Sequence, residues 1–446
     1  MREEDLEREL FTVGERLFNA CSAPSRGSLS WLDDRAMEFA SRDRELRAAL
    51  FRFVDVAPAC RSLDDLARHL TSFVGEVEEA PPPLAAAMRV GHTRAGRAML
   101  GRAAAAGVRH MAHRFIVGGS PKDAEAALRE LWQRSVASSV DLLGEATVTR
   151  AEADRYADRC RDALEQLTAF YAGLPARPRL EADSAGALPR ANLSVKISAL
   201  TPLLRSQAPE RGRHDAAERL RPLLRRAHAL GAHLHIDMES MDSTDAVLEL
   251  VLDVLSEDEF APGPSAGMVL QAYLRNSGDM LDRVLGWSVE NARASPLTVR
   301  VVKGAYWDHE IVQARQHGWI APVFEQKADS DRNFELLTRR LLEARPAVRV
   351  AIASHNLRSV AHAIACDRLL GGDGSDLEVQ VLRGLGDPLQ DALAVEGYRV
   401  RTYCPVGDLV AGMAYLVRRL LENTANESFL SEQARGAPLG ELLQAP

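Results

Sequence analysis

Eight short runs rich in β-branched and apolar residues follow one another from residue 139 onward, with longer helical stretches between them. The runs are SVDLLGEA from Ser139, LSVKISAL from Leu193, AHLHIDMES from Ala232, GMVLQAYL from Gly267, VRVVKGAY from Val299, VRVAIASH from Val348, LEVQVLRG from Leu377 and YRVRTYCP from Tyr398. Stretches such as DAAERLRPLLRRAHALG and DRNFELLTRRLLEAR between them have a helical pattern. Regular alternation of strand and helix predicts parallel βαβ units, and eight units favour a closed α/β barrel over an open sheet.

Most of these runs carry polar or otherwise unusual side chains toward their C-terminal ends. These residues are Glu145, Lys196, Asp237, Gln271, Lys303, Tyr306, His355 and Tyr403. In a parallel α/β barrel the functional groups gather at the C-terminal ends of the strands. The sequence therefore predicts a functional site at this end of the barrel.

The first hundred or so residues have only helical patterns. ELRAALFRFVDV and LDDLARHLTSFV show apolar residues at three- and four-residue intervals, and the triple proline at residues 81–83 interrupts the pattern. We expect residues 1–125 to form a helical arm or cap that packs on the main domain or on a partner. Residues 126–446 are expected to form the barrel, with a final helix over its mouth.

Composition excludes some classes of protein. The net charge of -8 and the pI of about 5.9 argue against a nucleic-acid partner. The five cysteines stand far apart without a CxxC pair, which argues against structural zinc and favours a reduced cytosolic chain. The N-terminus MREEDLEREL has no apolar signal region, and no apolar run is long enough to span a bilayer.

Lysine is rare in this arginine-rich chain. The four lysines are Lys122, Lys196, Lys303 and Lys327. A GC-rich coding bias explains the depletion, but it does not explain why three of the four stand in unusual local contexts. A lysine kept where arginine is the default suggests a site that needs a compact ammonium group.

The segment VKGAYW ends the fifth run. Gly304 removes a side chain where a flat ligand could lie against the backbone, and Lys303 supplies a positive charge. Tyr306 and Trp307 supply planar apolar surface. Taken alone, this motif is also what a strand end with a tight turn would show.

The segment AYLVRRLLEN near the C-terminus has a helical pattern. On a helix, Tyr415, Arg418, Arg419 and Glu422 share one side, because they stand at i, i+3, i+4 and i+7. Two adjacent arginines at a barrel mouth could clamp a carboxylate or a phosphate. The alternative is a solvated basic helix face.

The segment HLHIDMES favours a different class of site. His233, His235 and Asp237 alternate along a strand and so point the same way, as metal ligands do in some barrel hydrolases. Such a site would need further ligands on later strands, where only His355 is available. Packing with a local hydrogen bond is the simpler role for these histidines, and we expect no metal. The motifs GxGxxG after the first strand and GxxxxGK[ST] are missing, so neither a Rossmann domain nor a P-loop is supported.

Together these motifs resemble a known family. From about Asp141 to Phe429 the chain resembles proline dehydrogenase, especially the proline dehydrogenase domain of bacterial bifunctional proline utilization A (PutA) proteins. The matching stretches are DLLGEA, LSVKISAL, HIDMES, VLQAY, RVVKGAYWDHE, ASHN and YCPVGDLVAGMAYLVRRLLENTANESF. The resemblance implies a distorted (βα)8 barrel that binds FAD noncovalently at the C-terminal ends of its strands. It also implies oxidation of L-proline to Δ1-pyrroline-5-carboxylate by hydride transfer from C5 to flavin N5, with reoxidation by a membrane quinone.

The resemblance also implies roles for individual residues around the substrate. Arg418 and Arg419 would bind the proline carboxylate, with Lys196 as a third cation. Glu145 would pair with the first of these arginines and gate the pocket, and Asp237 would orient the cationic cluster. The residues expected to wall the proline ring are Tyr306, Leu382, Tyr403 and Tyr415.

A second set of residues resembles the family's cofactor contacts. Gln271 and Arg300 would hydrogen-bond the isoalloxazine, and Arg300 would tune its electronics. The cradle of the cofactor is expected from Lys303, Gly304 and Trp307. The residues expected at the pyrophosphate, ribose or adenosine are Lys327, Ser354, His355 and Glu422.

The sequence departs from the family in a few places. Met238 stands where relatives usually have a smaller residue, and Arg383 where they often have an aromatic residue or histidine. The aldehyde dehydrogenase half of a bifunctional protein is missing from this sequence. A Δ1-pyrroline-5-carboxylate dehydrogenase is therefore expected as a separate partner or as the remainder of a longer chain. A cytoplasmic location, with peripheral contact at the inner face of the membrane, is implied as well.

A non-catalytic relative acting as a binding module is the third alternative. Loss of Lys196, Arg418 or Arg419 would favour it, but all three residues are present.

Overall fold

The structure, a computed structural model, describes residues 2–21, 44–77, 93–144, 146–408, 412 and 438–446. The chain divides into two compact units. The first unit comprises Met1–Ala23, Ser120–Val406 and Pro438–Pro446, and the second comprises Pro24–Gly119 and Gly407–Ala437. The two units are defined by contacts within the chain, and they do not show which segments fold as separate domains. The predicted domain boundary between residues 125 and 126 therefore stays a prediction.

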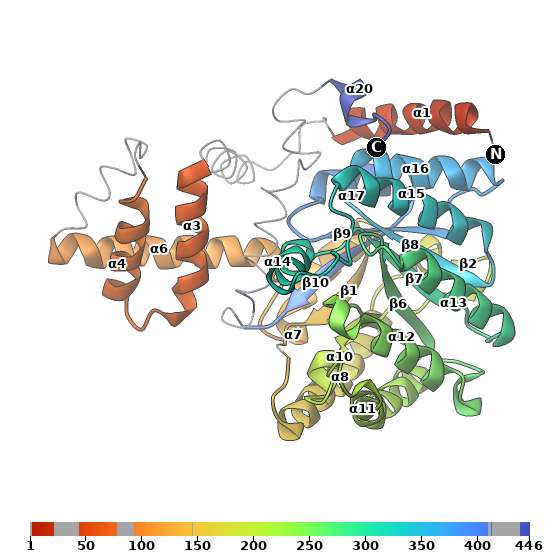
Figure 1. Cartoon of the computed structure of the whole chain (residues 1–446), viewed down its shortest axis with the longest axis horizontal. Coiled ribbons are helices and arrows are strands. Elements are labelled where there is room, and N and C mark those ends of the chain that lie inside the picture. Colours follow the sequence, from red (N-terminus) through yellow and green to blue (C-terminus); the bar gives the residue numbers. More distant parts are fainter. Residues whose placement is uncertain (1, 22–43, 78–92, 145, 409–411, 413–437) are drawn as a thin grey trace. The chain divides into compact units, whose positions relative to one another are not determined.

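The first unit is built on a closed barrel of parallel strands (Figure 1). Its strands are β1 (Ala137–Leu142), β4 (Asn192–Lys196), β5 (His233–Asp237), β6 (Ser265–Gln271), β7 (Leu297–Val302), β8 (Val348–Ala353), β9 (Leu377–Leu382) and β10 (Arg399–Val406). Each strand pairs with its neighbours in sequence, and β10 closes the ring against β1. All eight predicted strands are present, which confirms the predicted α/β barrel.

Helices surround the barrel strands, as Figure 1 shows. The helices of this unit are α1 (Glu3–Cys21), α7 (Pro121–Gln133), α8 (Arg150–Ala172), α9 (Pro178–Glu181), α10 (Ile197–Leu200), α11 (Pro209–Leu230), α12 (Met241–Leu255), η2 (Asp258–Phe260), α13 (Ser277–Glu290), α14 (Trp307–His317), α15 (Lys327–Glu343), α16 (Leu357–Leu369), α17 (Asp387–Val395) and α20 (Leu439–Leu442). Local sequence sets their ends: Thr149 and Glu152 form a capping box that starts α8, and Gly231, in the left-handed region at φ 61°, ends α11. Helices on the outside and side chains on the inside bury the strands on both faces, which is why their sequences are largely apolar.

Helix α1 packs on the barrel unit rather than with the other N-terminal helices. Arg358 of α16 donates to both carboxylate oxygens of Glu7 on α1, at 2.6 and 3.0 Å. The same guanidinium donates to Glu335 of α15 at 2.7 Å and to the Leu443 carbonyl at 2.6 Å. Only 6% of Arg358 is exposed, so one buried cation joins the two chain ends to two barrel helices.

The N-terminal ends of the strands, here called the barrel base, are filled by ion pairs. Arg401 of β10 donates two hydrogen bonds to Glu378 of β9, at 2.8 and 3.0 Å. Arg349 of β8 donates to Asp183 in the hairpin formed by β2 (Ala182–Asp183) and β3 (Gly186–Ala187), at 2.8 Å. Burial alone would raise the pKa of Glu378, but the neighbouring Arg401 outweighs it and lowers the pKa from 4.5 to about 2.

The second unit is helical in its described part. It contains α3 (Arg44–Val56), η1 (Ala57–Ala59), α4 (Leu63–Val74) and α6 (Arg94–Phe115). Leu46, Ala49 and Val77 form a buried cluster with Leu50 and Phe73 packed against it. The helical character predicted for the N-terminal region is confirmed for these segments.

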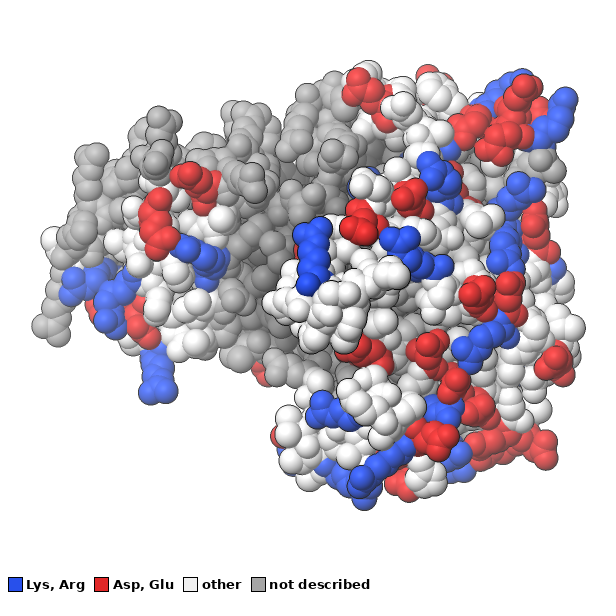
Figure 2. All heavy atoms as spheres, in the orientation of Figure 1, with Lys and Arg blue, Asp and Glu red and all other residues white. Residues whose placement is uncertain are grey.

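Surface charge and helix length both bear on the sequence-based expectations. Acidic and basic side chains intermix on the face of the barrel unit visible in Figure 2. Among the helices that the structure describes, none combines the length and apolar character needed to cross a bilayer.

The Glu378–Arg401 pair gives a test of the barrel base. We expect Glu378→Gln to destabilise the barrel by about 3–5 kcal/mol, because it leaves the buried Arg401 without its counter-charge. Since the folded pKa of Glu378 lies below 4.5, its stabilising contribution is complete above that pH and is lost as the pH falls toward 2. Urea unfolding followed by fluorescence at several pH values measures both effects. The exposed substitution Glu290→Gln on α13 is the control, and equal stability of the two variants would contradict the assignment.

Candidate active site

Asp237, the last residue of β5, joins side chains from three other strands at the C-terminal end of the barrel, here called the barrel mouth. Its Oδ1 accepts a hydrogen bond from Arg300 Nη1 of β7 at 2.7 Å, and its Oδ2 accepts one from the Tyr403 hydroxyl of β10 at 2.6 Å. The ammonium of Lys196, the last residue of β4, lies 3.8 Å from Oδ2. Three predicted site residues therefore converge on the carboxylate of a fourth, Asp237.

Lys196 has a second acidic partner in Asp141 of β1. The Lys196 Nζ lies 2.5 Å from Asp141 Oδ1, and the Asp141 side chain is fully buried. Burial alone would lower the pKa of Lys196, but Asp141 and Asp237 outweigh this effect and raise it above its usual 10.5. Lys196 is therefore a fixed ammonium at neutral pH.

Arg300 and Tyr403 are oriented by each other as well as by Asp237. The Arg300 guanidinium carbon lies 5.4 Å from the centre of the Tyr403 ring, and Nη2 contacts Ser194 Oγ at 3.4 Å. Burial, together with the nearby carboxylates, raises the pKa of Tyr403 well above 10. The phenol therefore stays protonated and donates a hydrogen bond to Asp237.

Among the described residues, the buried polar atoms at the barrel mouth without a hydrogen-bond partner include Gln271 Oε1 and Arg300 Nε. The two side chains are only 3% and 4% exposed, and an unsatisfied buried polar atom costs about 1–3 kcal/mol. The Gln271 amide is held by its Nε2, which donates to the Glu239 carbonyl at 2.9 Å. A polar ring system offering both donors and acceptors would satisfy these atoms, so they fit the edge of an isoalloxazine.

Lys303 and Lys327 share one carboxylate. Asp331 accepts from Lys303 Nζ at 2.5 Å and from Lys327 Nζ at 3.2 Å. Burial lowers the pKa of Lys303, and Asp331 opposes that shift. Two ammonium groups against one carboxylate leave a net positive charge, which suits a phosphate-bearing ligand.

The structure gives a second reason for the glycine at position 304. Gly304 has φ 138°, and a Cβ added there would lie 2.5 Å from Tyr273 Cδ1. The position that a Cβ would take is thus filled by the Tyr273 ring, so the glycine makes room for this ring. The predicted contact of a cofactor with the Gly304 backbone stays a prediction.

The neighbouring aromatic residues are placed by the start of α14. The Tyr306 carbonyl accepts from the Glu310 amide at 3.0 Å, which begins the helix. The Trp307 indole donates to the Phe324 carbonyl at 2.8 Å while 38% of the residue stays exposed. Their predicted contacts with substrate and cofactor stay predictions.

His355 and Leu382 come together from two adjacent strands. His355 Nε2 accepts from the Leu382 amide at 2.8 Å, which links the loop after β8 to the end of β9. The Ser354 hydroxyl accepts from the Asn356 amide at 3.1 Å, just before α16. These bonds fix the loop, and the predicted ligand contacts of the three residues stay predictions.

Five predicted site residues lie outside the described residues. They are Glu145, Tyr415, Arg418, Arg419 and Glu422. Their predicted roles stay predictions, as does the final helix over the barrel mouth.

The two histidines of β5 do not join Asp237 in a common site. His233 Nε2 contacts His235 Nδ1 at 3.2 Å, and His233 Nδ1 contacts Ser265 Oγ at 2.9 Å. Burial lowers the pKa of His233 to about 3. Asp237 is instead bound by cationic groups, which would compete with a metal ion. The arrangement does not support a metal hydrolase, and it agrees with packing and local hydrogen bonding for the histidines.

Our sequence analysis missed three residues that hold the predicted ones in place: Asp141, Asp331 and Tyr273. Asp141 interrupts an apolar strand run, and Asp331 stands four residues after Lys327 on α15. Both are signals that could have been used. Nothing in the sequence pairs Tyr273 with Gly304, since they lie on different strand ends.

A closed parallel barrel that gathers buried, paired polar side chains at the C-terminal ends of its strands has the architecture of the α/β-barrel enzymes. Two family models match the chain: "Proline dehydrogenase" over residues 124–432 and "Proline utilization A N-terminal domain" over residues 7–115. The chain belongs to the proline dehydrogenase family.

Individual relatives agree with this membership. The bifunctional protein PutA of Klebsiella aerogenes is 31% identical over 350 residues, which cover 76% of this chain and 25% of the relative. The proline dehydrogenase of Deinococcus radiodurans is 29% identical over 322 residues, covering 72% of this chain and 89% of the relative. A crystal structure of PutA from Bdellovibrio bacteriovorus inactivated by N-propargylglycine matches with a TM-score of 0.89 and 34% identity, covering 99% of this chain and 44% of that chain. This chain thus spans less than half the length of the PutA proteins that it matches.

The contact between Gly304 and Tyr273 can be tested with a matched pair of glycines. Gly304 and Gly318 both have positive φ, but the space beside Gly318 is open. We expect Gly318→Ala to cost about 1–2 kcal/mol from backbone strain alone. Gly304→Ala should cost about 1–3 kcal/mol more, because a Cβ there displaces the Tyr273 ring and because φ 138° is less accessible to alanine than the φ 66° of Gly318. Equal losses in thermal or urea unfolding would show that Tyr273 does not require the glycine.

Proposed function

We propose that this protein catalyses the FAD-dependent oxidation of L-proline to Δ1-pyrroline-5-carboxylate, the first step of proline catabolism to glutamate. Proline loses two electrons and two protons, with a hydride equivalent leaving ring carbon C5. The observation that carries the proposal is the convergence of Lys196, Arg300 and Tyr403 on Asp237 at the barrel mouth, in a chain of the proline dehydrogenase family.

The charge balance of this cluster bears on substrate binding. Lys196 and Arg300 are matched by Asp141 and Asp237, so these four side chains are together neutral. A substrate carboxylate therefore needs further positive charge, which Arg418 and Arg419 would supply according to the family pattern. Lys196 would be the third cation, held by its two carboxylates so that little side-chain entropy is lost on binding. Glu145 would pair with Arg418 and gate the pocket.

The substrate ring would be enclosed by apolar surface. Tyr306, Leu382, Tyr403 and Tyr415 are the proposed wall, which excludes water from the reacting carbon. The Tyr403 ring is fixed by its hydroxyl, so it cannot move aside for a larger ring substituent. This rigidity favours proline over hydroxyproline.

Residues of this chain would hold FAD, which supplies the two-electron acceptor for the oxidation. Gln271 Oε1 and Arg300 Nε, which have no partner among the described residues, would bond the isoalloxazine edge. Lys303 and Lys327 would meet the pyrophosphate, and the backbone of Gly304 would line the cofactor beside Trp307. Ser354, His355 and Glu422 are the proposed contacts to the ribose or the adenosine.

Two partners complete the proposal. A quinone at the membrane surface would accept the electrons, which requires a cytoplasmic protein that contacts the inner face of the membrane peripherally. The product would pass to a Δ1-pyrroline-5-carboxylate dehydrogenase, on a separate protein or on a longer chain. This second partner rests on the similarity to proteins named bifunctional PutA.

Anaerobic mixing tests the function directly. We expect the purified chain to contain FAD and L-proline to bleach its oxidised absorbance bands, whereas D-proline should leave them unchanged. Flavin that stays oxidised with L-proline but is reduced by dithionite would refute the proposal, as would a chain that takes up no FAD.

Lys196 gives a kinetic prediction. Lys196→Met removes a cation and leaves the cluster with net negative charge, so we expect the KM for proline to rise. Loss of a charge-assisted hydrogen bond worth about 1.5–3 kcal/mol corresponds to an increase of about 10- to 150-fold. Lys122→Met, on the surface of α7, is the matched control. An unchanged KM with normal FAD content would remove Lys196 from the binding site.

Arg300 gives an electrochemical prediction. Arg300→Met removes a buried positive charge from the proposed isoalloxazine edge, so the reduced and more negative flavin should become less stable. For each 1.4 kcal/mol lost, the midpoint potential should fall by about 30 mV. Potentiometric titration measures this shift, with Arg226→Met on the surface of α11 as the control. A wild-type potential with full FAD content would argue against contact with the flavin.

A further inference from the structure

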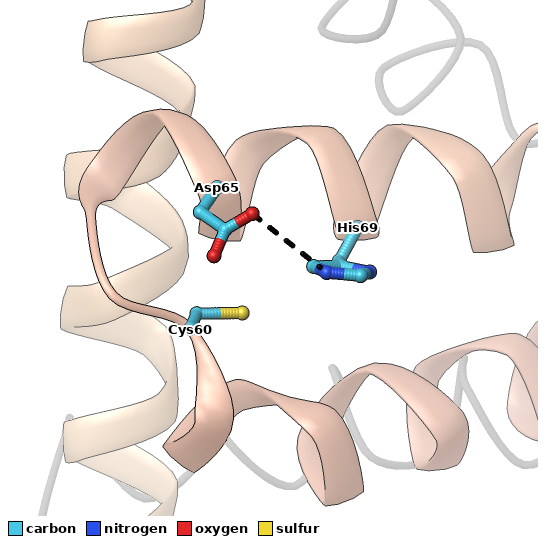
Figure 3. Close-up of side chains that lie close together, drawn as sticks. All are labelled: Cys60, Asp65 and His69. Carbon is cyan, nitrogen blue, oxygen red and sulfur yellow. Dashed lines mark ion pairs between the residues drawn. The ribbon is translucent and has the colours of Figure 1, made fainter.

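Three side chains of different chemistry surround one space in the N-terminal helical unit (Figure 3). They are Cys60 in the turn after η1, and Asp65 and His69 on α4. The thiol sulfur, a carboxylate oxygen and an imidazole nitrogen all lie within 4.8 Å of one another. Among the residues that the structure describes, no other three His, Cys, Asp or Glu side chains come together in this way.

Local structure fixes the positions of these residues. Asp65 and His69 stand at i and i+4, one above the other on the same face of α4. Ser62 caps the helix by accepting from the Asp65 amide at 3.1 Å. The Cys60 amide donates to the Ala57 carbonyl at 3.2 Å, which closes the turn and holds the thiol beside the helix start.

The two oxygens of Asp65 have different roles. Oδ2 accepts from the Arg61 amide at 3.2 Å, so it ties the turn that carries Cys60 to the first turn of α4. Oδ1 lies 3.8 Å from His69 Nε2 and faces the shared space. Carboxylates that bind a metal through one oxygen often accept a hydrogen bond on the other. Asp65 has this arrangement, since Oδ2 accepts from a backbone amide and Oδ1 is directed at the imidazole.

Arg68 is the competitor for Asp65, since its Nη2 lies 3.0 Å from Oδ1. However, the Arg68 side chain is 64% exposed and also lies 3.4 Å from Asp64, so it has an alternative partner. Exposed ion pairs of this kind contribute only about 0–1 kcal/mol. A metal ion could therefore displace Arg68 at little cost.

We propose that Cys60, Asp65 and His69 form a binding site for a thiophilic divalent transition metal such as Zn²⁺. Sulfur, nitrogen and oxygen ligands together suit zinc, whereas Mg²⁺ and Ca²⁺ prefer oxygen alone. In a tetrahedral zinc site these atoms stand about 3.5 Å apart, so small side-chain rotations close the observed spacing. Three protein ligands leave the fourth position to water, and on binding the thiol proton passes to solvent.

This site differs from the CxxC zinc motif, which is missing from the sequence. The ligands follow the spacing C-x₄-D-x₃-H within ten residues and need no CxxC pair. The bound ion would join the turn between α3 and α4 to the second turn of α4, and so would stabilise the helical unit. The proposal is independent of the proposed oxidation of proline.

Metal binding to the chain of 446 residues tests the site. Chelator-treated protein with reduced thiols is titrated with Zn²⁺, and the bound metal is counted by elemental analysis after desalting. Co²⁺ serves as a second probe, because thiolate coordination gives ligand-field bands at wavelengths beyond the flavin absorption. We expect one Zn²⁺ per chain, a thiolate–cobalt spectrum and a higher thermal midpoint of unfolding with zinc.

Matched variants separate this site from adventitious binding. Cys60→Ser and His69→Gln should each weaken binding by more than the roughly 10- to 100-fold typical of losing an outer-shell partner. The controls Cys21→Ser on α1 and His113→Gln on α6 should bind as wild type, and far-UV circular dichroism checks that all variants are folded. Wild-type protein that retains no stoichiometric zinc, or Cys60→Ser and His69→Gln proteins that bind as tightly as wild type, would overturn the proposal.

Discussion

The barrel mouth depends on a single buried carboxylate, that of Asp237. It accepts hydrogen bonds from a guanidinium and a phenol and lies beside an ammonium, and these groups come from three other strands. Buried cations are costly unless they are paired, so the two positive groups can stand this close together only because acidic side chains lie between them. The same pairing fixes their directions before any ligand binds, which is the condition for orienting a small substrate.

The barrel interior divides into two polar layers with different roles. At the base, Glu378 and Arg401 are paired and buried, which makes this end a stable closure. At the mouth, Asp237 and Tyr403 are part of a cluster that leaves polar atoms of its neighbours unsatisfied. Arg401 and Tyr403 stand two residues apart on β10, so one strand contributes to both layers because alternate side chains point inward. The buried ion pair of the base and the proposed ligand site of the mouth thus lie at opposite ends of the same strands.

Much of the site could be predicted because it lies where strands end. Lys196, Asp237 and Gln271 are each the last residue of a strand, and a parallel barrel brings such residues to one rim. Their partners could not be predicted in the same way. Asp141 lies closer to Lys196 than Asp237 does, but local sequence does not reveal this, because side-chain pairing between neighbouring strands depends on register and side-chain direction. The contact between Gly304 and Tyr273 could not be predicted either, because it joins the ends of two different strands.

The sequence by itself determined the strand and helix order, the closed barrel and the end at which polar groups gather. These properties follow from local periodicity and from the rule that parallel strands need helical connections. Only the tertiary structure decided that α1 packs on the barrel, through Arg358 of α16 and Glu7, which stand 351 residues apart in the chain. It also decided which carboxylate pairs with which cation. Contacts between residues so distant in sequence arise from packing in three dimensions, and no local pattern encodes them.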